Sequence, residues 1–180
     1  MVFSSITFIF YFLPIVLALY YIVPKKWKNI VLLISSLTFY FFGEPKYVFL
    51  MIFSILFTYI FGLLIEKYKG TKKSKLFLIL QICISLGLLI YFKYTDFLIK
   101  NINLWLDRKI DLLGVILPIG ISFYTFQMIS YVIDVYRGEV KAQKNLVTLA
   151  TYVALFPQLI AGPIVRYSTI DKQLEERTCT

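Results

Sequence analysis

Two runs of sequence decide the fold: LPIGISFYTFQMISYVIDVYRGE at Leu117–Glu139 and FPQLIAGPIVRY at Phe156–Tyr167. In the first run, polar side chains recur at spacings of three, four and three residues. At 3.6 residues per turn this spacing predicts one helical face, which we call the polar stripe. Its members are Tyr124, Gln127, Tyr131 and Asp134. Because polar atoms are costly in lipid, such a face points toward protein or a water-filled cavity, and we expect a functional site there.

The second run carries two prolines, Pro157 and Pro163, within one apolar stretch. Proline lacks a backbone N–H, and it pushes the residue before it toward extended geometry. We therefore expect breaks at Phe156 and Gly162, and a pair of half-helices or a re-entrant element in place of a straight helix. Irregular backbone at membrane depth is tolerated where it is buried or lines a cavity. The polar or small residues beside the breaks are Gln158, Gly162 and Arg166.

The composition indicates an integral membrane protein. The 180 residues are 59% hydrophobic and only 16% charged, with a mean hydropathy of +0.78. Five of six charge-free stretches reach the roughly 17 to 25 residues that a spanning helix needs, whereas Asn29–Gly43 is short. We expect an all-α, polytopic protein with about six hydrophobic segments, the last one broken or re-entrant. The stretches are Met1–Val23, Asn29–Gly43, Tyr47–Ile65, Leu76–Phe92, Leu112–Ile133 and Asn145–Val165.

The basic residues predict the orientation. They gather in three turns separated by pairs of hydrophobic segments, so all three turns lie on one side of the membrane. The positive-inside rule makes that side cytoplasmic, with the N-terminus outside. The three turns contain Lys25, Lys26 and Lys28; Lys67, Lys69, Lys72, Lys73 and Lys75; and Arg137, Lys141 and Lys144.

Several classes of function are excluded by the composition. The net charge of +9 reflects the basic turns and interfacial lysines, so we expect no nucleic-acid partner. Two cysteines, Cys83 and Cys179, make neither a disulfide framework nor a metal-ligand cluster, and we expect no metal site. Residues 1–180 form one membrane domain or part of one, with no internal boundary.

Two interpretations of the polar stripe are open from spacing alone. The stripe could line a substrate or acyl-chain tunnel with hydroxyl and amide groups. It could instead bond neighbouring helices, which is the commoner role of polar side chains in membrane bundles. At its cytoplasmic end, Asp134 and Arg137 are three residues apart, and this spacing fits an ion pair with no further function.

The two runs also carry a resemblance, together with MVFSS at Met1–Ser5 and YFKY at Tyr91–Tyr94. The chain resembles the membrane-bound O-acyltransferase family, most closely the alginate O-acetyltransferase-like proteins of bacterial envelopes. The resemblance covers nearly the whole chain and matches the N-terminal third to half of a family member. It implies a helical ring around a tunnel, in which an acyl group, most simply acetyl, passes from a cytoplasmic donor to an envelope or extracellular polysaccharide.

The resemblance implies a division of roles along the chain. Tyr124, Gln127 and Tyr131 would line or brace the tunnel. The broken segment would shape its constriction, and charged groups would organise the polar edges. The constriction residues are Gln158, Gly162 and Pro163, and the edge residues are Asp134, Arg137 and Arg166.

The catalytic residue is missing from this chain. The family relies on a membrane-embedded histidine in a later part of the protein, and this chain contains no histidine. Gln158 stands where some relatives carry a histidine, but an amide does not titrate in the useful range and cannot act as a general base. We therefore expect the 180 residues alone to be inactive.

The resemblance also predicts the surroundings of the chain. We expect the chain to lie in the bacterial inner membrane, in contact with lipid, and to bind no cofactor. The acyl donor on the cytoplasmic side would be acetyl-CoA or another acyl thioester. On the other side we expect an extracytoplasmic acetyltransferase partner or the polysaccharide acceptor. The alternative is a non-enzymatic membrane protein, such as a transporter subunit or assembly scaffold, because half-helices also build transport sites.

Overall fold

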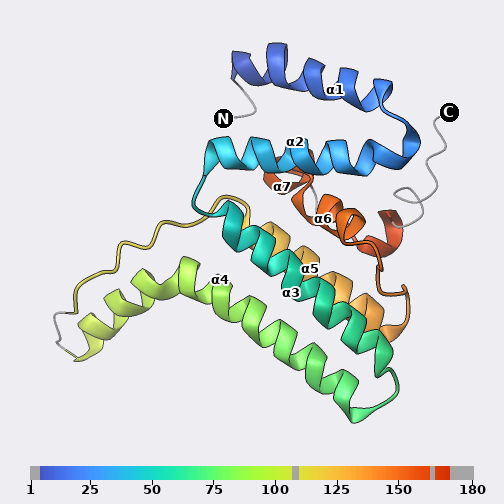
Figure 1. Ribbon diagram of the computed structural model, residues 1–180. Coiled ribbons are helices and arrows are strands. Elements are labelled where there is room, and N and C mark those ends of the chain that lie inside the picture. Colours follow the sequence, from blue (N-terminus) through green and yellow to red (C-terminus); the bar gives the residue numbers. More distant parts are fainter. Residues whose placement is uncertain (1–4, 107–109, 163–164, 171–180) are drawn as a thin grey trace.

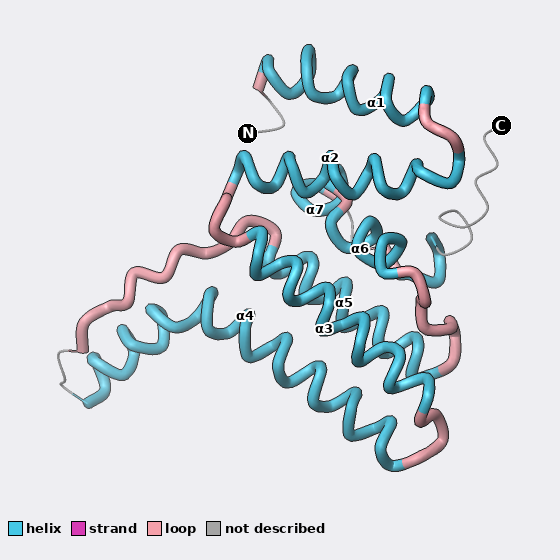
Figure 2. The backbone as a smooth tube through the Cα atoms, viewed as in Figure 1, coloured by secondary structure: helices cyan, strands magenta, loops and turns pink. Residues whose placement is uncertain are grey.

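The computed structural model describes residues 5–106, 110–162 and 165–170, and every regular element within these ranges is helical (Figure 1). Short turns join most of the helices, and one long irregular connector precedes α5 (Figure 2). The expected all-α class is thus confirmed. The elements are η1 Phe8–Phe12, α1 Leu13–Ile22, η2 Lys25–Trp27, α2 Lys28–Gly43, α3 Val48–Lys67, α4 Lys72–Leu106, α5 Ile121–Arg137, α6 Leu146–Ala154 and α7 Phe156–Ala161.

Among the described residues, two helices are long and apolar enough to cross a membrane, namely α3 and the Lys72–Trp105 part of α4. Only 39% of the apolar window of α3 and 17% of that of α4 are buried, so neither is the core helix of a water-soluble protein. Large apolar side chains are exposed on both, such as Phe49 at 73% and Leu76 at 58%. Such a surface needs lipid around it, and the chain is a membrane protein.

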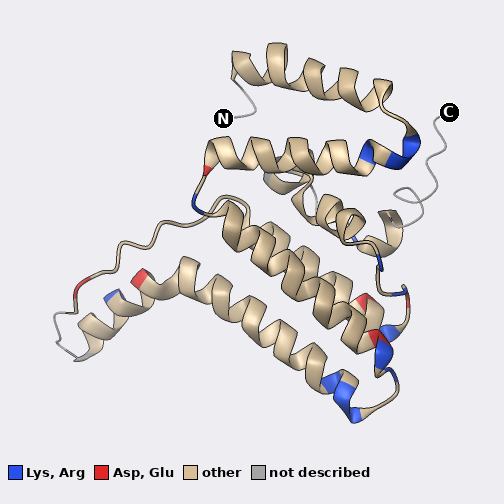
Figure 3. Cartoon of the chain, viewed as in Figure 1, with Lys and Arg blue, Asp and Glu red and all other residues tan. Residues whose placement is uncertain are grey.

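The core lies where α3 meets α5. Met51 and Ile55 of α3 and Met128 and Val132 of α5 are all buried there. The helix α3 also packs against α4, and α2 packs against α6, while α1 lies along α2 at the edge (Figure 1). The basic turns after α1, α3 and α5 lie toward the same end of the helices (Figure 3).

A second, aromatic cluster joins the start of the chain to its end. Phe8 and Phe12 of the first helical segment pack with Phe39 of α2 and Phe156 of α7. The ring centroids of Phe8 lie 5.4 Å from Phe39 and 5.9 Å from Phe156, in edge-to-face geometry. Such pairs each add about 0.5–1.5 kcal/mol beyond burial, so this cluster fixes α7 against α2.

The stretch Leu112–Ile133 is not helical throughout, and this corrects the expectation of one hydrophobic helix there. The helix α5 begins only at Ile121, and residues 110–118 are irregular. Their backbone is held from α4: Asn103 bonds both the N–H and the C=O of Ile110, and Asp96 accepts from the N–H of Leu113 at 3.1 Å. Hydropathy cannot reveal this, because the segment is as apolar as a helix.

The same connector is also held at the turn between α2 and α3. Tyr47 donates to the carbonyl of Ile116 at 2.9 Å. Glu44 accepts from the N–H of Ile119 at 2.8 Å, and Tyr40 donates to the carbonyl of Ile119 at 3.1 Å. Side chains thus replace the hydrogen bonds that a helix would have supplied to this backbone.

Candidate functional site

The polar stripe forms one buried face of α5, as the spacing predicts. The exposed fractions of its side chains are 1% for Tyr124, 3% for Gln127, 0% for Tyr131 and 3% for Asp134. All four side chains therefore lie against protein. The hydrogen-bond partners of Gln127 and Tyr131 show what the two central residues do.

Gln127 bonds a neighbouring helix. Its Nε2 donates to the carbonyl of Tyr152 at 2.9 Å, in the last turn of α6. The last carbonyls of a helix have no partner within the helix, and α6 ends at Ala154 because Leu155 is extended. Gln127 therefore closes the end of a half-helix.

Tyr131 bonds the loop between α5 and α6. Its hydroxyl accepts from the backbone N–H of Gln143 at 2.9 Å, and Gln143 Nε2 donates to the hydroxyl of Tyr167 at 2.8 Å. The ring of Tyr167 lies 5.0 Å from that of Tyr131 and 5.1 Å from that of Tyr152, edge to face in both cases. We call Tyr131, Tyr152 and Tyr167 the tyrosine cluster. It fills the space beside the middle of the stripe.

The two ends of the stripe differ from its middle. Tyr124 Oη and Asp134 Oδ2 are buried atoms with no hydrogen-bond partner among the described residues. The two central side chains of the stripe therefore bond neighbouring elements. Each of the two terminal side chains has one buried oxygen that bonds no described residue. Whether any of the four lines a tunnel stays a prediction.

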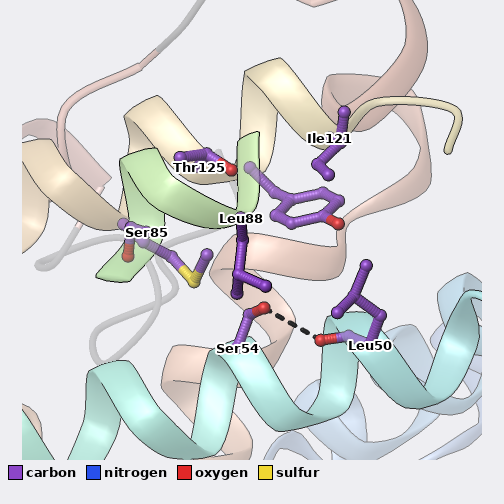
Figure 4. A pocket seen from close by; sticks show the side chains of 8 residues that line it. Leu50, Ser54, Ser85, Leu88, Ile121 and Thr125 are labelled. Carbon is purple, nitrogen blue, oxygen red and sulfur yellow. Dashed lines mark hydrogen bonds between the residues drawn. The ribbon is translucent and has the colours of Figure 1, made fainter. Parts of the chain in front are cut away.

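A small pocket lies next to Tyr124, between α3, α4 and α5. Its cavity volume is about 10 Å³, which is the size of one water molecule. Ser54, Ser85 and Thr125 line it together with apolar side chains such as Leu88 (Figure 4). The Ser54 hydroxyl donates to the carbonyl of Leu50 at 2.9 Å, as the dashed line in Figure 4 marks. The pocket is too small for an acyl chain.

The predicted edge residues line a larger groove. Asp134, Arg137 and Arg166 lie at one end of this cavity of about 290 Å³. Arg137 pairs with Glu139 at 3.8 Å, with side chains 61% and 43% exposed, so the expected pair with Asp134 is not the one observed among the described residues. Glu139 follows Arg137 by two residues and lies in the turn after α5. Its side chain is more exposed than that of Asp134, and it pairs with the Arg137 guanidinium there.

The second run is broken, but the prediction of an extended Phe156 is wrong, because the break lies one residue earlier in the sequence. Leu155 is extended, with φ −55° and ψ 112°, while Phe156 starts α7 and Pro157 lies in its first turn. Proline is well accommodated there, since the first N–H groups of a helix need no intrahelical acceptor. At the other end, Gly162 is extended as expected, with φ −88° and ψ 158°.

The constriction residues show a close backbone approach. A Cβ at Gly162 would lie 2.7 Å from the Cα of Gln158, so only glycine fits without movement. Gln158 is half-buried, and its Nε2 has no hydrogen-bond partner among the described residues. Pro163 lies outside the described residues.

Sequence reasoning missed the partners of the stripe. Gln143 and the carbonyl of Tyr152 bond the stripe, and Tyr167 packs its ring against Tyr131, yet only the folded structure reveals these buried partners. It also missed Gln81, whose Nε2 donates to Thr58 at 3.1 Å between α4 and α3. Gln81 is an isolated amide within the apolar stretch Leu76–Phe92, and this pattern alone would have predicted a buried hydrogen bond there. Within the part of the chain that the structure describes, no cluster of metal-ligating side chains occurs.

Comparison with known proteins identifies the relatives of this helical membrane protein. The chain is 42% identical over 185 residues to the probable alginate O-acetylase AlgI of Pseudomonas syringae pv. tomato, and equally identical to that of Pseudomonas aeruginosa. It is 34% identical over 206 residues to the peptidoglycan O-acetyltransferase of Helicobacter pylori. We found no family model and no solved structure that matches the chain.

The alignments cover all of the chain but only part of each relative. They span 100% of this chain and 36% of each Pseudomonas protein, and 98% and 39% for the Helicobacter protein. The chain thus spans little more than a third of the length of these curated relatives. It is homologous along its whole length to a part of bacterial O-acetylases, which confirms the resemblance predicted from the sequence.

Proposed function

We propose that the chain forms part of a membrane O-acyltransferase that moves an acyl group, most simply acetyl, across the membrane for O-acetylation of an envelope or extracellular polysaccharide. The observation that carries this proposal is the 42% identity to alginate O-acetylases along the entire chain. The name of the Helicobacter relative, a peptidoglycan O-acetyltransferase, supports acetyl transfer to a polysaccharide in general and leaves the acceptor open.

The role we assign to these residues is a wall of the tunnel. Gln127 and Tyr131 brace the wall from behind, because their hydrogen bonds go to α6 and to the loop before it. Tyr124 and Asp134 offer unused hydrogen-bonding atoms at the two ends of the same wall. The break at Gly162 shapes the constriction. This arrangement belongs to about six membrane segments, the last one re-entrant, in a helical ring that the rest of the family's chain completes.

We place the chain in the bacterial inner membrane with its N-terminus outside. The common end of the three basic turns supports this orientation (Figure 3). It puts Arg137 and Arg166 near the cytoplasm, where acetyl-CoA or another acyl thioester would be the donor. An extracytoplasmic acetyltransferase partner or the polysaccharide acceptor would then meet the opposite end, near Glu44. The general base comes from outside these 180 residues, since they contain no histidine.

A segment exchange tests this proposal. The matching segment of the Pseudomonas aeruginosa relative is replaced by this chain, and the O-acetyl content of alginate is measured in cells that lack the native protein. The proposal predicts O-acetylation above the background of the empty vector, and none from the chain expressed alone. The relative's own segment, re-inserted through the same junctions, is the control. A chimera that reaches the membrane at the control's level but transfers no acetyl groups contradicts the proposal.

A second candidate is a non-enzymatic role, as a transporter subunit or scaffold. The half-helices α6 and α7 favour it, because broken helices also form transport sites. Under this alternative the chimera would be well produced and inactive. The segment exchange therefore separates the two candidates.

A further inference from the structure

The groove along α5 has a mainly apolar length and a charged end. Phe126, Ile129 and Ile133 supply its apolar lining at helical spacing, and Ser130 adds one hydroxyl between them. Phe126 is 46% exposed, and the other two are half-buried. The charged residues lie where α5 ends, beside a cavity of about 290 Å³. A molecule that follows this groove must be apolar along most of its length and polar at one end.

The buried charged group of the groove is Asp134. Its side chain is 3% exposed, and Oδ2 has no hydrogen-bond partner among the described residues. A buried carboxylate oxygen without a donor destabilises the protein, so a ligand that brings a donor is favoured there. An ammonium group satisfies this oxygen best, because it adds opposite charge to the hydrogen bond.

The other charged groups are two exposed guanidiniums. Among the described residues Arg137 forms a loose ion pair of 3.8 Å with Glu139, and Arg166 is exposed beside the same cavity. Guanidinium groups bind phosphate oxygens in a fixed, often bidentate geometry. The lining of the cavity thus holds one carboxylate beside two guanidiniums. A ligand that carries both a negative and a positive group matches this lining.

We propose that this groove binds a phospholipid with a primary-amine headgroup, such as phosphatidylethanolamine. The phosphodiester bonds Arg137 and Arg166, the ammonium donates to Asp134, and an acyl chain follows Phe126, Ile129 and Ile133. The carboxylate selects an N–H donor, so a choline headgroup, which has the charge but no N–H, binds less well. This inference goes beyond acyl transfer and requires only that the chain lies in a membrane.

Native mass spectrometry of the purified chain in detergent tests the proposal. Phosphatidylethanolamine, phosphatidylcholine and phosphatidylglycerol with identical acyl chains are added at equal concentration. We expect phosphatidylethanolamine to be retained about tenfold over phosphatidylcholine, the ratio expected for one charge-assisted hydrogen bond. Equal retention of these two lipids, or stronger retention of phosphatidylglycerol, overturns the proposal.

Variants separate the two halves of the headgroup. Asp134→Asn keeps an acceptor oxygen but loses the negative charge, so it should reduce the preference for ethanolamine over choline. Arg166→Gln should reduce retention of both lipids alike, because both carry the phosphate. Lys72→Gln, a change at an exposed lysine on another basic turn, should change neither. Circular dichroism shows whether Asp134→Asn folds. If it does not, the Arg166→Gln variant still tests the proposal, because Arg166 is exposed. Unchanged lipid retention in Arg166→Gln overturns the proposal. Lipid retention needs no acyl donor. The lipid-binding proposal can therefore fail while the segment exchange succeeds, and the reverse is equally open.

Discussion

The carbonyl of Tyr152 accepts a hydrogen bond of 2.9 Å from Nε2 of Gln127, which ties α5 to the last turn of α6. This contact explains why an amide occupies the buried face of an otherwise apolar helix. The half-helix α6 ends at the buried Ala154, so its last carbonyls need donors from other parts of the protein. The break in the second run is thus stable because the first run supplies the missing donor.

Replacing this amide should weaken the whole junction. In Gln127→Leu the Tyr152 carbonyl loses its side-chain donor, and we expect a loss of about 1–3 kcal/mol in the free energy of unfolding. Denaturant unfolding in detergent measures it. The neighbouring change Phe126→Leu, at a side chain that is 46% exposed, is the control and should stay within about 0.5 kcal/mol. A Gln127→Leu protein as stable as that control would show that the bond contributes nothing.

Two tyrosines of the same stripe should respond differently to loss of the hydroxyl. Tyr131→Phe leaves the buried N–H of Gln143 without its acceptor, so we expect a cost of about 1–3 kcal/mol in unfolding free energy. Tyr124→Phe removes a hydroxyl that has no partner among the described residues, and its effect should be near zero or stabilising. Thermal unfolding of both variants under one condition makes the comparison. Equal losses in the two variants would contradict this account of the stripe.

The sequence predicted the helices well where hydropathy and length agree. The short stretch Asn29–Gly43 became α2, and Tyr47–Ile65 became α3, each within two residues at either end. It failed for the start of Leu112–Ile133, because Glu44, Tyr47 and more distant side chains hold an apolar segment in irregular form. Such tertiary hydrogen bonds join positions up to 79 residues apart, and no local pattern encodes them.

For the candidate site, the sequence predicted the face but not its partners. Facial spacing identified Tyr124, Gln127, Tyr131 and Asp134 correctly as one buried surface. Whether each residue bonds protein or remains unused depends on where α6 lies, and the fold places Tyr152 beside Gln127. The interpretation of the stripe as helix-bonding therefore holds for Gln127, while Tyr131 bonds the loop before α6. Tyr124 Oη and Asp134 Oδ2 bond no described residue.

Gly120 should resist substitution because of both its backbone and its surroundings. Its φ is +75°, which disfavours other residues, and a Cβ would lie 3.0 Å from Leu159 Cγ and 3.1 Å from the Leu159 carbonyl oxygen. We expect Gly120→Ala to cost about 1–3 kcal/mol in unfolding free energy. Gly87→Ala in α4, where a Cβ meets nothing within 4 Å, is the matched control and should be neutral or stabilising. A tolerated Gly120→Ala would mean that α5 and α7 do not approach this closely.

The connector before α5 should loosen when its carboxylate anchor is removed. Glu44 accepts from the N–H of Ile119 at 2.8 Å, so Glu44→Leu leaves that amide without an acceptor. We expect the hydrogen-exchange protection of the Ile119 amide to fall by about tenfold, the effect of one hydrogen bond to a charged group. Glu44→Gln keeps an oxygen at the same position and should retain much of the protection. Hydrogen exchange read by mass spectrometry distinguishes these outcomes, and equal protection in Glu44→Leu and the unaltered chain would rule out the anchor.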